Sequence, residues 1–197
     1  MDLKTTKLTL LLALGWLLCL PSLARALDPC LLITKAEAEM IMGEEVKGPL
    51  PGKVTGFAAG DRCDYQTAAP LAQRGRVGTI NLILFDPQTM AREGGVFRSP
   101  RKYFLKQRHA LGKNAKNLKD LAELADQAFW LPGPDVLHLL AGDCYLQLQV
   151  KDMVEMKGAS KTDLAQKLSA HRLKLSTRVA REHILPRLKT AKSRRLG

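Results

Sequence analysis

The chain has 197 residues, 46% of them hydrophobic, and its 31 lysines and arginines outnumber 19 acidic residues to give a net charge of +12. The length fits one ordinary domain that can bury most of its apolar surface. No internal repeat is visible, and no segment after residue 20 is apolar enough to span a membrane, which excludes repeat and multi-span architectures. The positive charge favours anionic partners such as lipid headgroups, polysaccharide or nucleic acid.

Residues 1–26 have the organisation of a cleavable export signal. Two lysines precede an apolar run of 13 residues, Leu8–Leu20, and Ala24-Arg25-Ala26 then places small residues where a signal peptidase reads. A membrane anchor is the alternative, but a span needs about 20 apolar residues. We therefore expect a secreted or periplasmic protein that begins near Leu27 and has lost Cys19 with the signal.

The predicted mature chain keeps 28 basic and 18 acidic residues, so its net charge is +10. Eleven basic residues but only two acidic residues lie between Lys161 and Arg195. Export removes cytoplasmic nucleic acid as a partner, so no nucleic acid is expected, and anionic lipid or polysaccharide of the cell envelope remains. A solvated helix with a loose tail is the simpler interpretation of this basic segment.

A short helix and a strand are the first elements expected in the mature chain. Thr34 and Glu37 have the spacing of a capping box, which predicts a helix that ends at Gly43. The glycines and prolines of residues 47–60 predict a loop. Residues 62–67 follow as a short strand.

The next segment predicts one central strand and two helices. Residues 77–85 are apolar on both faces, as expected for a strand that is covered on both sides. Asp86-Pro87 and Ser99-Pro100 each have the order of a helix N-cap and a first helical residue. The second of these helices should end near Leu111.

A strand over residues 128–131 and a hairpin are predicted next. Residues 136–141 and 144–151 flank Gly142-Asp143, and a two-residue loop between apolar runs is typical of a β-hairpin. The second hairpin strand alternates strictly, so Cys144 shares its apolar face with Leu146, Leu148 and Val150.

The mature chain contains three cysteines, which cannot all pair within one molecule. Because Cys144 lies on the apolar face of its strand, it is predicted to be buried and reduced. This leaves Cys30 and Cys63 to form a disulfide, which an oxidising compartment permits.

A long amphipathic helix begins near Ser160, and Pro186 should end or kink it. The domain organisation expected is therefore a signal peptide over residues 1–26, one domain over 27–186 and a basic disordered tail over 187–197. The candidate contacts to an anionic surface are the basic residues of this helix and tail: Arg172, Lys174, Arg178, Arg181, Arg187, Lys189, Lys192, Arg194 and Arg195.

These elements predict an α+β fold, with a mainly antiparallel sheet covered by the N-terminal and C-terminal helices. No catalytic, cofactor-binding or metal-binding motif is present: the sequence has no Gly-rich phosphate loop, no paired-cysteine metal motif and no Gly-x-Ser-x-Gly elbow. No cofactor is expected, and the chain should be a monomer or a weak oligomer.

Single residues allow functional and structural interpretations side by side. His171 is either a ligand or pH sensor, or a hydrogen-bonded core histidine, which we favour. Cys144 would be a nucleophile only if His138 lay beside it, and a buried structural thiol is the favoured alternative. Four aspartates would form an acidic site only if folding gathered them: Asp61, Asp64, Asp126 and Asp143.

Phe129 and Trp130 are adjacent aromatic residues that precede Leu131-Pro132-Gly133. They could line a ligand groove, since ligand sites are commonly walled by aromatic side chains. Packing in the core is the favoured alternative.

Three segments are familiar in combination: the start Asp28-Pro29-Cys30-Leu31-Leu32-Ile33-Thr34-Lys35-Ala36-Glu37-Ala38, the later Cys63-Asp64-Tyr65, and Leu124-Ala125-Asp126-Gln127-Ala128-Phe129-Trp130. Together they resemble small exported bacterial proteins of the DUF3558-like type over roughly residues 28–150. The resemblance implies an α/β/α sandwich of the Mog1/PsbP kind and a Cys30–Cys63 pair, but no catalytic residues. Ala125 and Gln127 stand where that pattern has Gly and Glu.

Three functions are therefore expected, in decreasing order of support. The first is an exported, non-enzymatic binding or accessory domain. The second is an envelope-docking protein that binds anionic lipid or polysaccharide through its basic C-terminal helix and tail. The third is a hydrolase whose site is assembled only in the fold.

Overall fold

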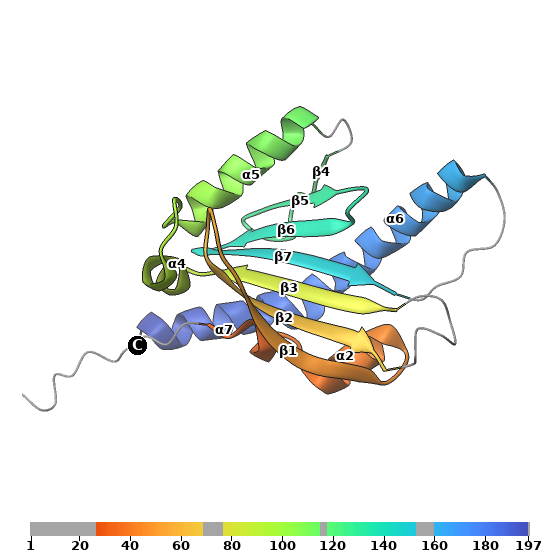
Figure 1. Cartoon of the computed structure of the whole chain (residues 1–197), viewed down its shortest axis with the longest axis horizontal. Coiled ribbons are helices and arrows are strands. Elements are labelled where there is room, and N and C mark those ends of the chain that lie inside the picture. The colour runs from red at the N-terminus through yellow and green to blue at the C-terminus, as the bar shows by residue number, and fades with distance from the viewer. Residues whose placement is uncertain (1–26, 69–76, 115–117, 153–159, 197) are drawn as a thin grey trace, which may run out of the picture.

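A computed structural model describes residues 27–68, 77–114, 118–152 and 160–196. Its centre is a seven-stranded sheet in which every neighbouring pair is antiparallel (Figure 1). In spatial order the strands are β1 (Val46–Val54), β2 (Gly60–Thr67), β3 (Thr79–Phe85), β7 (Cys144–Lys151), β6 (Val136–Ala141), β5 (Gln127–Leu131) and β4 (Lys119–Asp120). The predicted α+β fold with an antiparallel sheet is confirmed.

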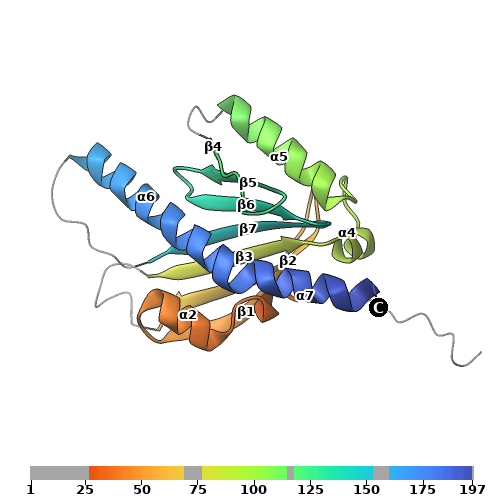
Figure 2. The ribbon, with the colours of Figure 1, turned by 180° about the vertical axis from the view of Figure 1, so that it is seen from behind.

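One face of the sheet is covered by both ends of the described chain (Figure 2). The helices on this face are η1 (Pro29–Leu31), α2 (Lys35–Met42), α6 (Lys161–Val179), the π-helical turn η2 (Ala180–Ile184) and α7 (Leu185–Leu196). Their apolar side chains pack on the alternating apolar residues of β7, such as Leu146 and Leu148. The N-terminal and C-terminal helices therefore cover the sheet as predicted, and both lie on the same side.

The opposite face carries α4 (Pro87–Glu93) and α5 (Pro100–Asn114), which lie over the sheet on the other side from α6 (Figures 1 and 2). A second, largely aromatic core forms there from Phe85, Phe104, Phe129 and Tyr145. The rings of Phe85 and Tyr145 stack with their centroids 5.1 Å apart. The three layers make an α/β/α sandwich.

Local sequence rules account for the ends of most of these elements. Thr34 caps α2 through a complete capping box with Glu37, and Gly43 ends that helix with a left-handed φ of 71°. The Asp86 carboxylate accepts from the backbone N–H groups of Gln88 and Thr89 at the start of α4. The hairpin of β6 and β7 has the predicted boundaries.

Residues 47–60 differ from the predicted loop, because most of them form the edge strand β1 and its turn into β2. An edge strand pairs on one side only, so the missing N–H groups of its prolines cost no ladder hydrogen bond. Gly48 has a φ of 126°, and a Cβ there would lie 2.7 Å from the Asp64 carbonyl oxygen, so this position needs glycine.

Pro186 was expected to end or kink the helix, and it does not end it. The backbone of residues 187–196 is helical, so the predicted disorder of the tail is wrong as far as Leu196. The Leu185 N–H bonds to the Ala180 carbonyl in the π-helical turn, and the helix then continues as α7. Pro186 directly follows the π-helical turn, where the regular i→i−4 hydrogen bonding is already interrupted, so the helix accommodates its missing N–H there. The predicted domain boundary therefore lies inside a continuous helix.

None of the described helices is long and apolar enough to cross a lipid bilayer. The predicted export signal, residues 1–26, lies outside the described residues.

Candidate functional site

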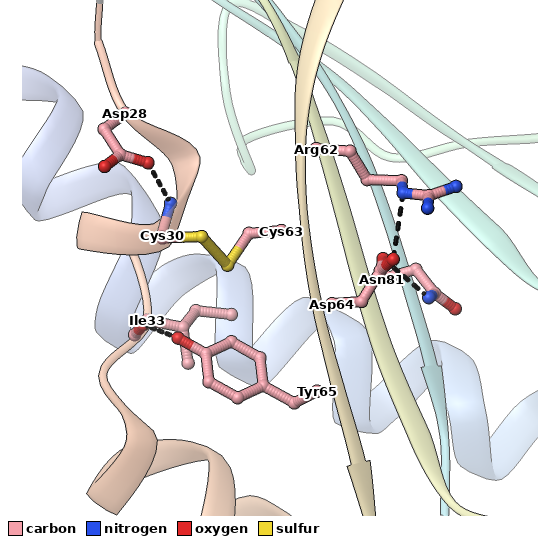
Figure 3. The surroundings of a disulfide bond; sticks show 8 residues. All are labelled: Asp28, Cys30, Ile33, Arg62, Cys63, Asp64, Tyr65 and Asn81. Carbon is pink, nitrogen blue, oxygen red and sulfur yellow. Dashed lines mark hydrogen bonds and ion pairs between the residues drawn. A yellow bond between two sulfur atoms is a disulfide. The ribbon is translucent and has the colours of Figure 1, made fainter. Parts of the chain in front are cut away.

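Cys30 and Cys63 form a disulfide between η1 and β2, with their Cα atoms 5.2 Å apart (Figure 3). The predicted pairing is confirmed. The Asp28 carboxylate accepts from the Cys30 N–H at 2.8 Å, and the Tyr65 hydroxyl donates to the Ile33 carbonyl oxygen. These contacts attach the N-terminal segment to the sheet, so the bridge has a structural role here.

Phe129 and Trp130 do not share a groove. The two rings project from opposite faces of β5. Phe129 is 0% exposed and lies in the aromatic core, beside Phe104 of α5. Trp130 is 3% exposed and lies in the core on the face covered by α6. The Trp130 indole N–H donates to the Ser169 hydroxyl at 3.4 Å. Both rings therefore pack in the core, as favoured, and the groove alternative is excluded for them.

The nine predicted cationic contacts divide into three groups. Arg172 and Arg187 are engaged inside the protein, by Asp135 at 2.8 Å and Glu37 at 2.7 Å. The side chains of Lys192, Arg194 and Arg195 lie outside the described residues. The remaining four are exposed on α6, η2 and α7: Lys174, Arg178, Arg181 and Lys189.

The contact with His138 that a nucleophilic Cys144 would need is not formed, which agrees with the favoured interpretation of a buried structural thiol. Cys144 lies in the core on the face covered by α7 and lines one pocket with Leu185 and Leu188 of that helix. His138 lies on the other face of the sheet, stacked on Phe129 with ring centroids 4.3 Å apart. His171 bonds to the Asp152 carboxylate at 2.5 Å and is about one-third exposed. His171 is therefore hydrogen-bonded, as favoured, but lies at the edge of the core.

Folding brings two of the four candidate aspartates, Asp126 and Asp143, to the same pocket and leaves the other two elsewhere. Asp61 accepts from the Thr89 hydroxyl at 2.8 Å. Asp64 pairs with Arg62 at 2.9 Å and accepts from the Asn81 amide at the same distance, on the face of the sheet away from the disulfide (Figure 3). Asp126 and Asp143 instead meet at one pocket at the end of the sheet.

This hairpin pocket has a volume of about 540 Å³ and lies between the β6–β7 turn, the turn before β5, Leu27 and α7. Its apolar walls come mainly from leucines and alanines of these segments. It is lined by Leu27, Glu123, Leu124, Ala125, Asp126, Ala141, Gly142, Asp143, Cys144, Leu185, Leu188, Lys189 and Ala191.

The pocket is built on a hydrogen bond between its two turns. The Asp126 carboxylate accepts from the Gly142 N–H at 2.8 Å, which joins the turn before β5 to the β6–β7 hairpin. Gly142 has a φ of 62°, as a tight two-residue hairpin turn requires. Glu123 also has a left-handed φ, 68°, which is uncommon for a residue other than glycine.

Acidic side chains outnumber basic ones among the residues that line the pocket. Glu123, Asp126 and Asp143 carry three carboxylates, and Lys189 is the basic residue among those that line it. The Cys144 thiol lies 3.6 Å from the Asp143 carboxylate. An apolar cavity with a negative rim is suited to a ligand that combines an apolar group with a positive charge.

Among the described residues, no cluster of three or more metal-ligating side chains is present. Comparison of the chain with protein-family models, with curated proteins and with solved structures found no match.

Sequence analysis singled out Lys189, Asp126 and Asp143 separately but missed the pocket. Glu123, Leu185 and Leu188 gave no signal, because they line the pocket only once the turn before β5 and α7 meet in the fold. The Gly142-Asp143 turn was the one local clue to the site's position.

Proposed function

We propose that this chain is an exported binding domain without a reaction of its own, and that its ligand occupies the hairpin pocket. The lining of the pocket is the observation that carries the proposal: three carboxylates border apolar walls around a volume of about 540 Å³, within the roughly 300–1,000 Å³ of small-molecule sites. The Cys30–Cys63 disulfide supports export, because such bridges persist in oxidising compartments.

The ligand class follows from the walls and the rim. Leu124, Leu185 and Leu188 offer apolar contact, and the carboxylates of Glu123 and Asp143 stand exposed at the pocket. A primary amine beside an aromatic or aliphatic group matches both features. The Asp126 carboxylate is already used by the Gly142 N–H, so it orients the turn as well as adding charge.

A titration of the disulfide-bonded chain from Leu27 to Gly197 with benzylamine tests this proposal. NMR shifts of the Gly142 and Asp143 amides should saturate with a Kd of about 1–20 mM, as expected for a fragment of this size. Benzoate, the matched anion, should bind at least about fivefold more weakly, because the rim repels it.

Two tryptophan variants on α7 locate the binding. Ala191→Trp fills the pocket that Ala191 lines and should abolish the benzylamine shifts. Thr190→Trp is the matched control, because Thr190 is exposed on the same turn and does not line the pocket. Equal binding of benzylamine and benzoate, or unchanged binding by Ala191→Trp, would contradict the proposal.

A further inference from the structure

Two loops touch at one end of the molecule. The turn between β1 and β2 meets the loop between α4 and α5 through a hydrogen bond from the Phe97 N–H to the Phe57 carbonyl oxygen, 3.0 Å long. A Cβ on Gly95 would lie 3.2 Å from the same oxygen, so the backbones are in direct contact. This tip lies at the same end of the molecule as α4 and the C-terminal end of α7 (Figures 1 and 2).

The tip presents apolar side chains to solvent. Phe57 and Val96 are each 74% exposed. The chain has five phenylalanines, and the other four pack in or against the aromatic core: Phe85, Phe97, Phe104 and Phe129. Packing of the fold therefore does not account for the position of Phe57.

Three basic residues lie within six positions after Val96 in the sequence. Arg98, Arg101 and Lys102 are exposed, and none forms an ion pair within the described ranges. The first turn of α5 contains no acidic residue. Positive charge at the start of a helix opposes the helix dipole, so helix stability does not account for these residues either.

We infer that this docking tip, formed by Phe57, Val96, Arg98, Arg101 and Lys102, binds the surface of an anionic lipid bilayer. Phe57 and Val96 enter the apolar layer, and the three cations contact the headgroup phosphates. An anionic polysaccharide offers charge but no apolar phase, so lipid is the partner that matches both halves of the surface. The inference is independent of the hairpin pocket and moves the docking surface away from α6.

Co-flotation with vesicles of 70% phosphatidylcholine and 30% phosphatidylglycerol tests the inference on the disulfide-bonded chain from Leu27. Changing Arg98, Arg101 and Lys102 together to Gln should weaken binding by about 100-fold, at about fivefold per cation. The matched control changes Lys174, Arg178 and Arg181 to Gln, which removes the same charge from α6 and should have less than a threefold effect by comparison.

The apolar half needs its own pair of variants. Phe57→Ala should weaken binding by about tenfold. Met40→Ala is the control, because Met40 is also 74% exposed but lies on α2. Circular dichroism and thermal melts of all variants should match the unaltered chain, since the substituted side chains are exposed.

Insertion is read directly from a tryptophan at the tip. Phe57→Trp in a Trp130→Phe background should shift its emission to shorter wavelength with vesicles and be quenched by brominated lipid. Equal losses with the tip and α6 triple variants would overturn the inference. Unchanged vesicle binding by Phe57→Ala, or no quenching by brominated lipid, would also overturn it. The same holds if binding to dextran sulfate depends on Phe57 as strongly as vesicle binding does.

Discussion

His138 is a buried, neutral side chain held between two aromatic rings. Its Nδ1 lies 2.7 Å from the Tyr145 hydroxyl, which also accepts from the Gln147 amide at 2.7 Å. Burial raises the pKa of Tyr145, so the hydroxyl keeps its proton and can donate to Nδ1. The His138 Nε2 has no hydrogen-bond partner among the described residues.

This environment should make the protein sensitive to mild acid. Burial lowers the pKa of His138 from 6.5 to about 3. As the pH falls below 6.5, His138 becomes protonated in the unfolded chain but stays neutral in the folded chain. The free energy of unfolding therefore decreases until the pH reaches about 3. Between pH 7.5 and 4.5 this residue alone should lower the free energy of unfolding by about 3 kcal/mol.

His138→Phe keeps the ring stack on Phe129 and removes the titrating group. Urea unfolding of the variant should show a free energy that falls less steeply between pH 7.5 and 4.5 than that of the unaltered chain. His109→Phe, at an exposed position of α5, is the control and should leave the slope unchanged. Parallel slopes for His138→Phe and the unaltered chain would refute a buried neutral imidazole.

At the scale of elements, an ion pair, called the clamp below, joins the first α-helix of the described chain, α2, to the last, α7. The Arg187 guanidinium on α7 donates to both oxygens of Glu37 on α2, at 2.7 and 2.8 Å, and to the Leu32 carbonyl oxygen at 2.8 Å. Glu37 also completes the capping box with Thr34. The guanidinium and the other donors hold the pKa of Glu37 at about 2, below its ordinary 4.5.

A double-mutant cycle measures this clamp. Glu37→Gln and Arg187→Gln should each cost about 1–3 kcal/mol of stability, with a coupling of about 1–2 kcal/mol. Because the folded pKa is the lower one, the coupling is fully present above pH 4.5 and is lost as the pH falls towards 2. Urea unfolding at low salt checks it, because urea is uncharged and does not screen the ion pair. Additive single-variant losses at pH 7 would show that the clamp does not stabilise the fold.

The clamp also explains where sequence prediction succeeded and failed. Capping residues such as Thr34 and Asp86 act on neighbours within a few residues, so their helices were predictable. The α7 helix is attached to α2 by the contact between Arg187 and Glu37, 150 residues apart in sequence, and β1 is paired with β2. Neither contact leaves a local pattern, so a tail and a loop were predicted there.

The hairpin pocket was unpredictable for the same reason. Its parts lie in four separate segments, and the hydrogen bond that joins Asp126 to Gly142 spans 16 residues. The alternation of β7, in contrast, was sufficient to place Cys144 in the core and thereby to select the disulfide. The cysteine chemistry was therefore predictable where the binding site was not.

At the scale of the whole molecule, the proposed functions share one end of the sandwich. The hairpin pocket includes α7 and the first residue of the predicted mature chain, and the docking tip lies at the end where α7 finishes. Export is the claim on which these proposals depend, because cleavage before Leu27 would leave the new N-terminus at the wall of the pocket, and export would give the docking tip access to envelope lipid.

The intact mass of the protein recovered from the periplasm or the medium, without reduction, tests export most directly. The predicted mass is that of residues 27–197 with one disulfide, and peptide mapping should yield a Cys30–Cys63 linked peptide with Cys144 alkylated after unfolding. A chain that retains residues 1–26, or one in which Cys30 and Cys63 are alkylated without reduction, would contradict the account.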